Sequence, residues 1–154
     1  HFSADGTLLG SFPVEGPSGA GVATNQLGMA PDGTFYVPDC GPNCDHFLLL
    51  HYSQDGTLLG MVKADPSAHW STQQAVGIAF DANGQLYVTS MIWNHPVGFV
   101  NVFDSSGQLV TSWDIGGNPY GIALDGKGRV YVVDWTANTL TAYQLPPSAA
   151  TPTP

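Results

Sequence analysis

Short apolar runs separated by turn-forming dipeptides recur along the whole chain. The runs are rich in Val, Tyr, Phe and Ile, and Asp-Gly, Asn-Gly or Ser-Gly bounds them. Runs of this length and composition are typical of β-strands that tight turns join into hairpins. Because 19 Gly and 12 Pro make a fifth of the residues, turns should be frequent and helices few.

Two sequence phrases alternate along the chain. One joins a Gly-containing apolar run to a Tyr-Val run through a short turn, and it begins at Gly28, Gly77 and Gly121. The other ends a run on an aromatic residue, turns at a Gly and starts a Leu-rich run; its aromatic residues are Phe2, Tyr52, Phe103 and, in a degenerate fourth copy, Tyr143. Each period therefore holds four expected strands, exemplified by residues 121–124 (a), 129–133 (b), 139–144 (c) and 109–113 (d).

Four antiparallel strands repeated at spacings of 40 to 51 residues are the sequence form of a β-propeller blade. The expected fold class is all-β, with three four-stranded antiparallel propeller-type blades. Because Phe2 and Tyr143 hold equivalent positions, the strand order is d-abcd-abcd-abc over residues 1–145. Residues 146–154 are expected to form a Pro/Ser/Thr-rich linker or tail.

Three blades are too few for an ordinary closed propeller, which has about four to eight. The a–b–c set at the C-terminus lacks its outer strand, and residues 7–12 lack a sheet. An unpaired strand edge is a template for another chain. Three solutions remain open: half of a six-bladed propeller that two protomers complete, an open array or filament of neighbouring chains, and a cropped piece of a longer chain.

The repeats resemble the NHL-repeat family over nearly the whole chain to Leu145. The third unit shows the fullest pattern, in Pro119-Tyr120-Gly121-Ile122-Ala123-Leu124-Asp125, Val130-Tyr131-Val132-Val133-Asp134 and Asn138. The second unit keeps Asn94-His95 where the family has Asn-His, whereas the first has Gln26-Leu27 in place of Pro-x and a shortened a–b turn. The resemblance implies a propeller-type fold. It implies no single activity, because this fold hosts lyases, hydrolases and binding modules.

The charge balance excludes some classes of partner. The chain has 3 Lys+Arg against 12 Asp+Glu, a formal net charge of −9. No basic patch is available for a phosphate backbone or an anionic membrane surface, so neither nucleic-acid binding nor membrane insertion is expected. Much of the acidity follows from the turns, where Asp accepts backbone hydrogen bonds; the turn residues are Asp5, Asp32, Asp55, Asp81, Asp104 and Asp125. Weak surface binding of Ca²⁺ is the one metal interaction expected, and no cofactor is expected.

Cys40 and Cys44 flank Gly-Pro-Asn in the b–c connection of the first unit. A disulfide across so short a loop is favoured over half of a metal site, because a metal would need two further soft ligands and the chain has no other cysteine. A disulfide implies an oxidising compartment, and hence secretion to the cell surface or beyond. The Pro-rich tail adds candidate O-glycosylation residues, Thr151 and Thr153, although a plain linker or frayed tail is the favoured interpretation.

Aromatic residues in two loops offer a candidate binding patch, made of His69, Trp70, Trp93 and His95. Such side chains in long loops can stack on sugars or dock proteins. The alternative is that they cover the blade ends.

An active site finds little support in the residue pattern. The positions expected around a central channel carry amides, namely Asn25, Gln26, Gln73, Gln74 and Asn118. Amides alone are a poor cage for Ca²⁺ or Zn²⁺. His46 and His51 should face opposite sides of one strand, which favours structural roles. Asp39 and Asp134, with Ser90 at the equivalent position, should bind blade-end turns.

These patterns predict no catalytic and no metal-ligating residue. The leading hypothesis is a secreted, non-catalytic structural or interaction module, which associates with itself as an oligomer or fibre or binds another extracellular protein or a glycan. Two alternatives stay open. One is half of a six-bladed propeller lyase or hydrolase with a metal-dependent channel site. The other is a receptor sensor ectodomain.

Overall fold

The computed structural model describes residues 1–14, 16, 26–39, 47–63, 74–92 and 95–145. These residues form three antiparallel sheets and no helix. The first sheet holds β1 (Gly28–Met29), β2 (Phe35–Asp39), β3 (Leu48–Tyr52) and β4 (Leu58–Lys63). The second holds β5 (Gln74–Phe80), β6 (Leu86–Met91), β7 (Gly98–Phe103) and β8 (Leu109–Asp114). The third holds β9 (Pro119–Leu124), β10 (Arg129–Asp134) and β11 (Thr139–Gln144).

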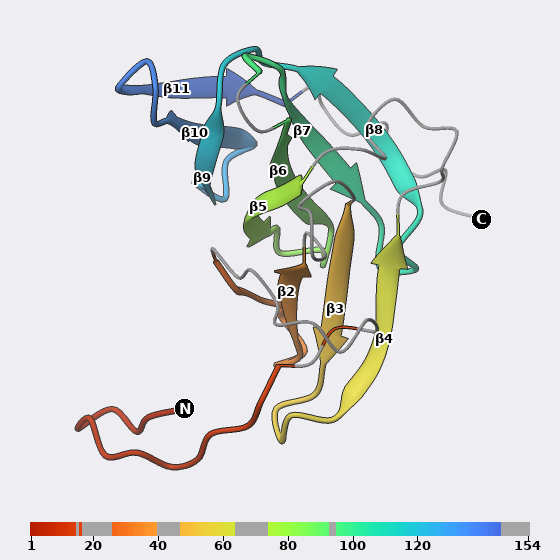
Figure 1. Ribbon diagram of the computed structural model, residues 1–154, viewed down its shortest axis with the longest axis vertical. Coiled ribbons are helices and arrows are strands. Elements are labelled where there is room, and N and C mark those ends of the chain that lie inside the picture. Colours follow the sequence, from red (N-terminus) through yellow and green to blue (C-terminus); the bar gives the residue numbers. More distant parts are fainter. Residues whose placement is uncertain (15, 17–25, 40–46, 64–73, 93–94, 146–154) are drawn as a thin grey trace.

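Neighbouring strands in each sheet are consecutive in the chain, so each sheet is a meander. The sheets follow one another along an arc, with β4 and β8 on its outer side and β5 and β9 on its inner side (Figure 1). The third sheet stops at β11 and has three strands. The all-β prediction and the strand order abcd-abcd-abc are therefore confirmed. The described residues contain no helix that could cross a membrane.

One detail of the first unit was predicted wrongly. Gly28 pairs with Tyr36, as Ala79 pairs with Tyr87, so the a–b turn has the same length in both sheets and is not shortened. Gly28 thus corresponds to Ala79 rather than to Gly77. A Cβ atom on Gly28 would lie 2.1 Å from the Cγ2 atom of Ile78, and this close approach of the next sheet explains the glycine.

Apolar side chains fill the spaces between sheets. One cluster joins Phe47 and Leu49 of the first sheet region to Ile78, Val88 and neighbours in the second. Another joins the opposite face of the second sheet, including Val100, to the third. The face of the first sheet that points away from the second sheet holds a third cluster, with Phe35, Val37, Leu48, Leu50 and Tyr52. The alternation of strand side chains between two faces lets each sheet contribute to two such clusters.

Candidate interaction site

The N-terminal segment repeats the c–d turn of the complete sheets. Phe2 pairs with Leu8 in an isolated antiparallel bridge, as the last residue of β3 pairs with the first of β4. Gly6 N donates to Ser3 O at 3.0 Å and Ser3 N donates to Thr7 O at 2.9 Å, and the same two hydrogen bonds close the β3–β4 turn. Residues 7–12 are thus the beginning of an outer strand outside the three sheets, as the repeat count predicts.

Asp5 stabilises this turn as Asp55 stabilises its counterpart. In each turn a carboxylate oxygen accepts hydrogen bonds from the serine hydroxyl two residues earlier and from the threonine amide two residues later. The serine hydroxyl chiefly, and then the threonine, holds the pKa of each carboxyl below its usual value. Identical chemistry in both turns indicates that the N-terminal turn is a structured copy.

Phe12 anchors the N-terminal segment on the face of the first sheet that points away from the second sheet. Its ring centroid lies 5.6 Å from that of Phe35 and 6.3 Å from that of Tyr52. Val14 packs on the same cluster. The equivalent residues at the end of β8, Trp113 and Ile115, pack in the same way on the cluster between the second and third sheets.

Two turn glycines give independent evidence that Phe12 lies in the position of an outer-strand residue. A Cβ atom on Gly56 would lie 2.4 Å from Cγ of Phe12, and one on Gly107 would lie 3.2 Å from Cγ2 of Val62. The c–d turns of the first and second sheets therefore each touch an outer-strand residue of the preceding unit. Phe12 holds, against the first sheet, the place that Val62 holds against the second. The N-terminal segment therefore lies where the outer strand of a unit preceding the first sheet would lie. The described residues do not include the other strands of that unit.

β11 presents the complementary open edge. Within the described part of the chain it pairs with β10 alone. Leu145 N donates to Gly128 O, on the β10 side. Because amide direction alternates along a strand, the N–H groups of Leu140, Ala142 and Gln144 point to the open side. Leu140 is 66% exposed, whereas its equivalents Leu49 and Val100 are fully buried.

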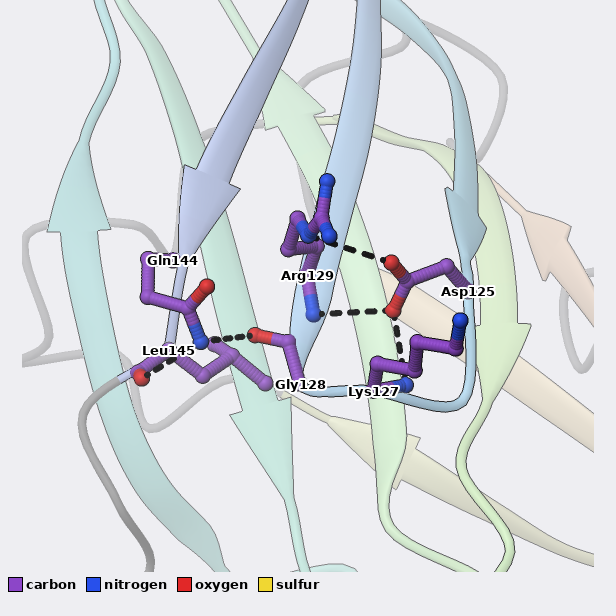
Figure 2. A network of polar contacts seen from close by, with 6 residues as sticks. All are labelled: Asp125, Lys127, Gly128, Arg129, Gln144 and Leu145. Atoms are coloured by element: carbon purple, nitrogen blue, oxygen red, sulfur yellow. Dashed lines mark hydrogen bonds and ion pairs between the residues drawn. The ribbon is translucent and has the colours of Figure 1, made fainter.

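The end of β11 is held firmly against β10, as Figure 2 shows. Gly128 O accepts from Leu145 N at 2.9 Å and from Gln144 Nε2 at 3.1 Å. Asp125 Oδ1 accepts from Lys127 N at 2.7 Å and from Arg129 N at 3.1 Å, and the Arg129 guanidinium lies 3.3 Å from the carboxylate. The amide of Lys127 is the main cause of the lowered pKa of Asp125. The Gly128 contacts hold the end of β11 on β10, and the Asp125 contacts close the turn between β9 and β10.

The face of the third sheet that points away from the second is also apolar. Tyr131 pairs with Ala142, and Val133 pairs with Leu140. Their counterparts in the first two sheets face the next sheet along the arc, as Tyr36 and Leu49 do. Here Val133 and Leu140 are exposed. We name the outer edge of β11 together with this face the C-terminal edge, and residues 7–12 the N-terminal strand.

Most of the site residues predicted from sequence lie outside the described residues. These are Cys40, Cys44, His69, Trp70, Trp93, Thr151 and Thr153, so the disulfide, the loop patch and the glycosylation residues stay predictions. His95 is described. It is exposed, and its backbone bonds to Ile92 and Val97 in a tight turn.

The predicted channel amides have structural contacts where they are described. Gln74 is buried and pairs with Met91. Asn118 N donates to Asp134 Oδ2 at 2.9 Å, and Asn118 Nδ2 donates to Thr136 Oγ1 at 3.1 Å. Asn25, Gln73 and His46 lie outside the described residues, and Gln26 is exposed. No group of three or more His, Cys, Asp or Glu side chains suited to a metal occurs in the part of the chain that the structure describes.

Asp134 binds the blade-end turn, as predicted. Its Oδ1 atom accepts from Thr136 N and Ala137 N, both at 2.9 Å. Burial raises the pKa of Asp134, but the hydrogen bonds from Ala137, Asn118 and Thr136 together lower it below its usual value. At the equivalent position, Ser90 instead accepts from Asn101 Nδ2 at 2.7 Å.

His51 is a structural histidine, as predicted, although its partners were not predictable. Its Nε2 atom lies 2.8 Å from Thr34 Oγ1, and Thr34 Oγ1 donates to Asp32 Oδ1 at 2.7 Å. Its ring stacks on Tyr36 at 4.2 Å. Burial lowers the pKa of His51, and the Asp32 carboxylate opposes that shift. Because the Thr34 hydroxyl donates its proton to Asp32, Thr34 Oγ1 is the acceptor for an N–H at Nε2 of His51.

The meanders, their arc-like order and their interleaved apolar faces define a partial β-propeller. Comparison with solved structures agrees. Virginiamycin B lyase from Staphylococcus aureus matches with a TM-score of 0.54 and 14% identity, over 94% of this chain and 47% of the lyase chain. A protein of unknown function from Bacteroides caccae matches with a TM-score of 0.51 and 12% identity, over 90% of this chain and 50% of the other.

The chain spans about half the length of these two structures. At such low identity the likeness concerns the fold alone. No family model matches the chain, and no curated protein matches it.

Proposed function

We propose that this chain is a secreted, non-catalytic structural module, built of NHL-like propeller repeats, that works by associating through its open blade edges. The observation that carries the proposal is the exposure of Leu140 on an unextended β11, at a position that is fully buried in the other two sheets. The N-terminal strand supports it as well, because Phe12 and Val14 hold it in the place of an outer strand. Binding of other extracellular partners through the loops is a secondary part of the proposal.

The physical argument rests on unmet strand pairing and uncovered apolar surface. Exposed edge strands usually carry charges, bulges or prolines that prevent pairing. β11 reads Thr-Leu-Thr-Ala-Tyr-Gln and carries none of these. Burying a fully exposed Leu contributes roughly 1.5–3 kcal/mol, and the added backbone ladder would come with it. Association therefore has both a geometric template and a driving force.

The test is the molar mass of the purified chain, measured by light scattering across a concentration series. We expect a mass that rises above that of the monomer at micromolar concentration. A folded species that stays monomeric throughout would overturn the proposal.

A lyase or hydrolase half is the second candidate, favoured by one observation. The chain covers 47% of the virginiamycin B lyase chain, so a complete ring would need as much again. Elemental analysis of the associated protein distinguishes the candidates, because the enzyme hypothesis requires a stoichiometric metal ion at the channel.

A further inference from the structure

Resting on the proposed self-association, we infer that the partner of β11 is the N-terminal strand of a second copy of this chain, in one defined register. The occupant is argued from sequence and from geometry. Residues 3–10 repeat residues 53–60 with a single difference, Ala4 in place of Gln54. The chain therefore carries, near its N-terminus, a duplicate of the turn and strand that complete the first sheet, and the described residues of the third sheet include no such strand.

The complete sheets fix the register. Val102 pairs with Thr111 and Asn101 pairs with Ser112. Transferring these pairs to the equivalent positions puts Ala142 opposite Gly10 and Thr141 opposite Ser11. The same transfer puts Leu140 opposite Phe12, as Val100 lies opposite Trp113 in β7 and β8 and Leu49 opposite Val62 in β3 and β4.

The side chains brought together by this register match. Ser112 Oγ donates to Asn101 Oδ1 at 2.7 Å, and the corresponding pair, Ser11 and Thr141, consists of two hydroxyl side chains that can bond in the same way. Leu140 would join Phe12 at the cluster of Phe35 and Tyr52. Val100 and Trp113 share the equivalent cluster in the second unit.

The backbone of the N-terminal strand already shows the required pattern. His1 N donates to Gly10 O at 3.0 Å, and Gly10 N points to His1 O. His1 and Phe2 thus hold the positions that Ala142 and Tyr143 of a second copy would take. Exchange replaces this short pairing with one along the length of β11. Pro13 fits, because the pairing amides belong to Gly10 and Phe12 and the position of Pro13 faces the outer edge, where proline is tolerated.

Paired cysteines test the register. Thr141 and Ser11 would form a non-hydrogen-bonded pair with Cα atoms about 4.5 Å apart, within the range of roughly 4.4–6.8 Å that a disulfide spans. We would mix Ser11→Cys with Thr141→Cys under mild oxidation and identify linked peptides by mass spectrometry. Ser11→Cys mixed with Thr139→Cys is the matched control, because that pair is two residues out of register.

We expect a link between residues 11 and 141 in the first mixture and at least tenfold less link in the control. Association without this link, or with equal linking in the control, would overturn the exchange while leaving the proposed self-association standing. Absence of association in unmodified chain and variants alike would overturn both. Light scattering of the linked product then shows whether the assembly is closed. A mass of two chains indicates a ring of six units, and larger species indicate an open array.

Discussion

Leu140 and Val100 occupy equivalent positions in neighbouring sheets, yet Val100 is fully buried and Leu140 is 66% exposed. Val100 is covered by the sheet that follows it. Leu140 has no following sheet among the described residues. Among the described residues, a side chain that the repeat places for burial is thus exposed, and this contrast locates the surface where a neighbour would add most.

Replacing Leu140 tests that surface. We expect Leu140→Asp to weaken association about tenfold or more, because it removes apolar burial and places a charge at the contact. Sedimentation equilibrium of the variant measures the change. Val110→Asp is the control, since Val110 is 53% exposed on β8, outside both the C-terminal edge and the N-terminal strand. Equal weakening by both variants would show that general acidity, and not the C-terminal edge, is responsible.

The contact between Gly56 and Phe12 gives a stability prediction within one chain. Gly56 and Gly84 both have φ near +80 to +90°, but a Cβ atom would meet a close neighbour only at Gly56. Both Gly→Ala changes should destabilise through backbone strain, by about 1 kcal/mol. Gly56→Ala should be worse by a further amount of about 1 kcal/mol, as overpacking predicts.

A double variant isolates the cause. In a Phe12→Ala background, we expect the effect of Gly56→Ala on the free energy of unfolding to fall to that of Gly84→Ala. Urea denaturation of the four variants measures these values. If the penalty at Gly56 is the same with and without Phe12, the N-terminal strand is not packed against the β3–β4 turn.

The turn carboxylates predict a loss of stability in acid. Hydrogen bonds lower the pKa values of Asp5, Asp32, Asp55, Asp104, Asp125 and Asp134 below the ordinary 3.8. Because the folded state holds protons less tightly than the unfolded state, their contribution is complete above pH 3.8 and is lost as pH falls through the folded pKa values. Unfolding free energies measured from pH 6 to pH 2 should decline below about pH 4. Asp134→Asn should make that decline shallower, and a flat profile would contradict the assignment.

Salt should favour association. Each copy carries a net charge of −9, so two copies repel one another at long range. Screening shortens that range from roughly 10 Å at 0.1 M salt to about 3 Å at 1 M. We expect the association constant from sedimentation to increase several-fold over this interval. A marked decrease would indicate that opposite charges hold the copies together, against an interface made of β11 and apolar side chains.

Much of the fold follows from local chemistry that the sequence displays. Turn glycines such as Gly56 and Gly107 have positive φ, and their spacing marks the hairpins. The Tyr-Val runs then identify the b strands, β2, β6 and β10, which lie between two neighbouring strands in each sheet. The first-unit register was mispredicted because Gly28 was matched with Gly77 by residue type. The hairpin pairs Gly28 with Tyr36 instead, and a strand register is set by its turn.

The unpaired strand edges of the interaction site were predictable from sequence, but the side-chain contacts around them were not. Counting strands shows that, among the described residues, residues 7–12 belong to none of the three sheets and β11 has one open edge. It cannot show that Phe12 stacks on Phe35, because that contact joins different units through space. The signal was nevertheless present in the equivalence of Phe12 with Trp113, both of them large aromatic residues at the same step of an outer strand. The partner of His51 was hidden because Thr34 lies 17 residues away in the chain, in the turn between β1 and β2.

Proline at Ala142 gives the most direct test of association through β11. The Ala142 amide faces the open side, so Ala142→Pro leaves the hydrogen bonds to β10 in place and removes a donor that an added strand needs. Light scattering, with circular dichroism to verify folding, should show assemblies for the unmodified chain and a folded monomer for Ala142→Pro. If the folded variant assembles as strongly as the unmodified chain, the edge of β11 is not where copies of this protein meet.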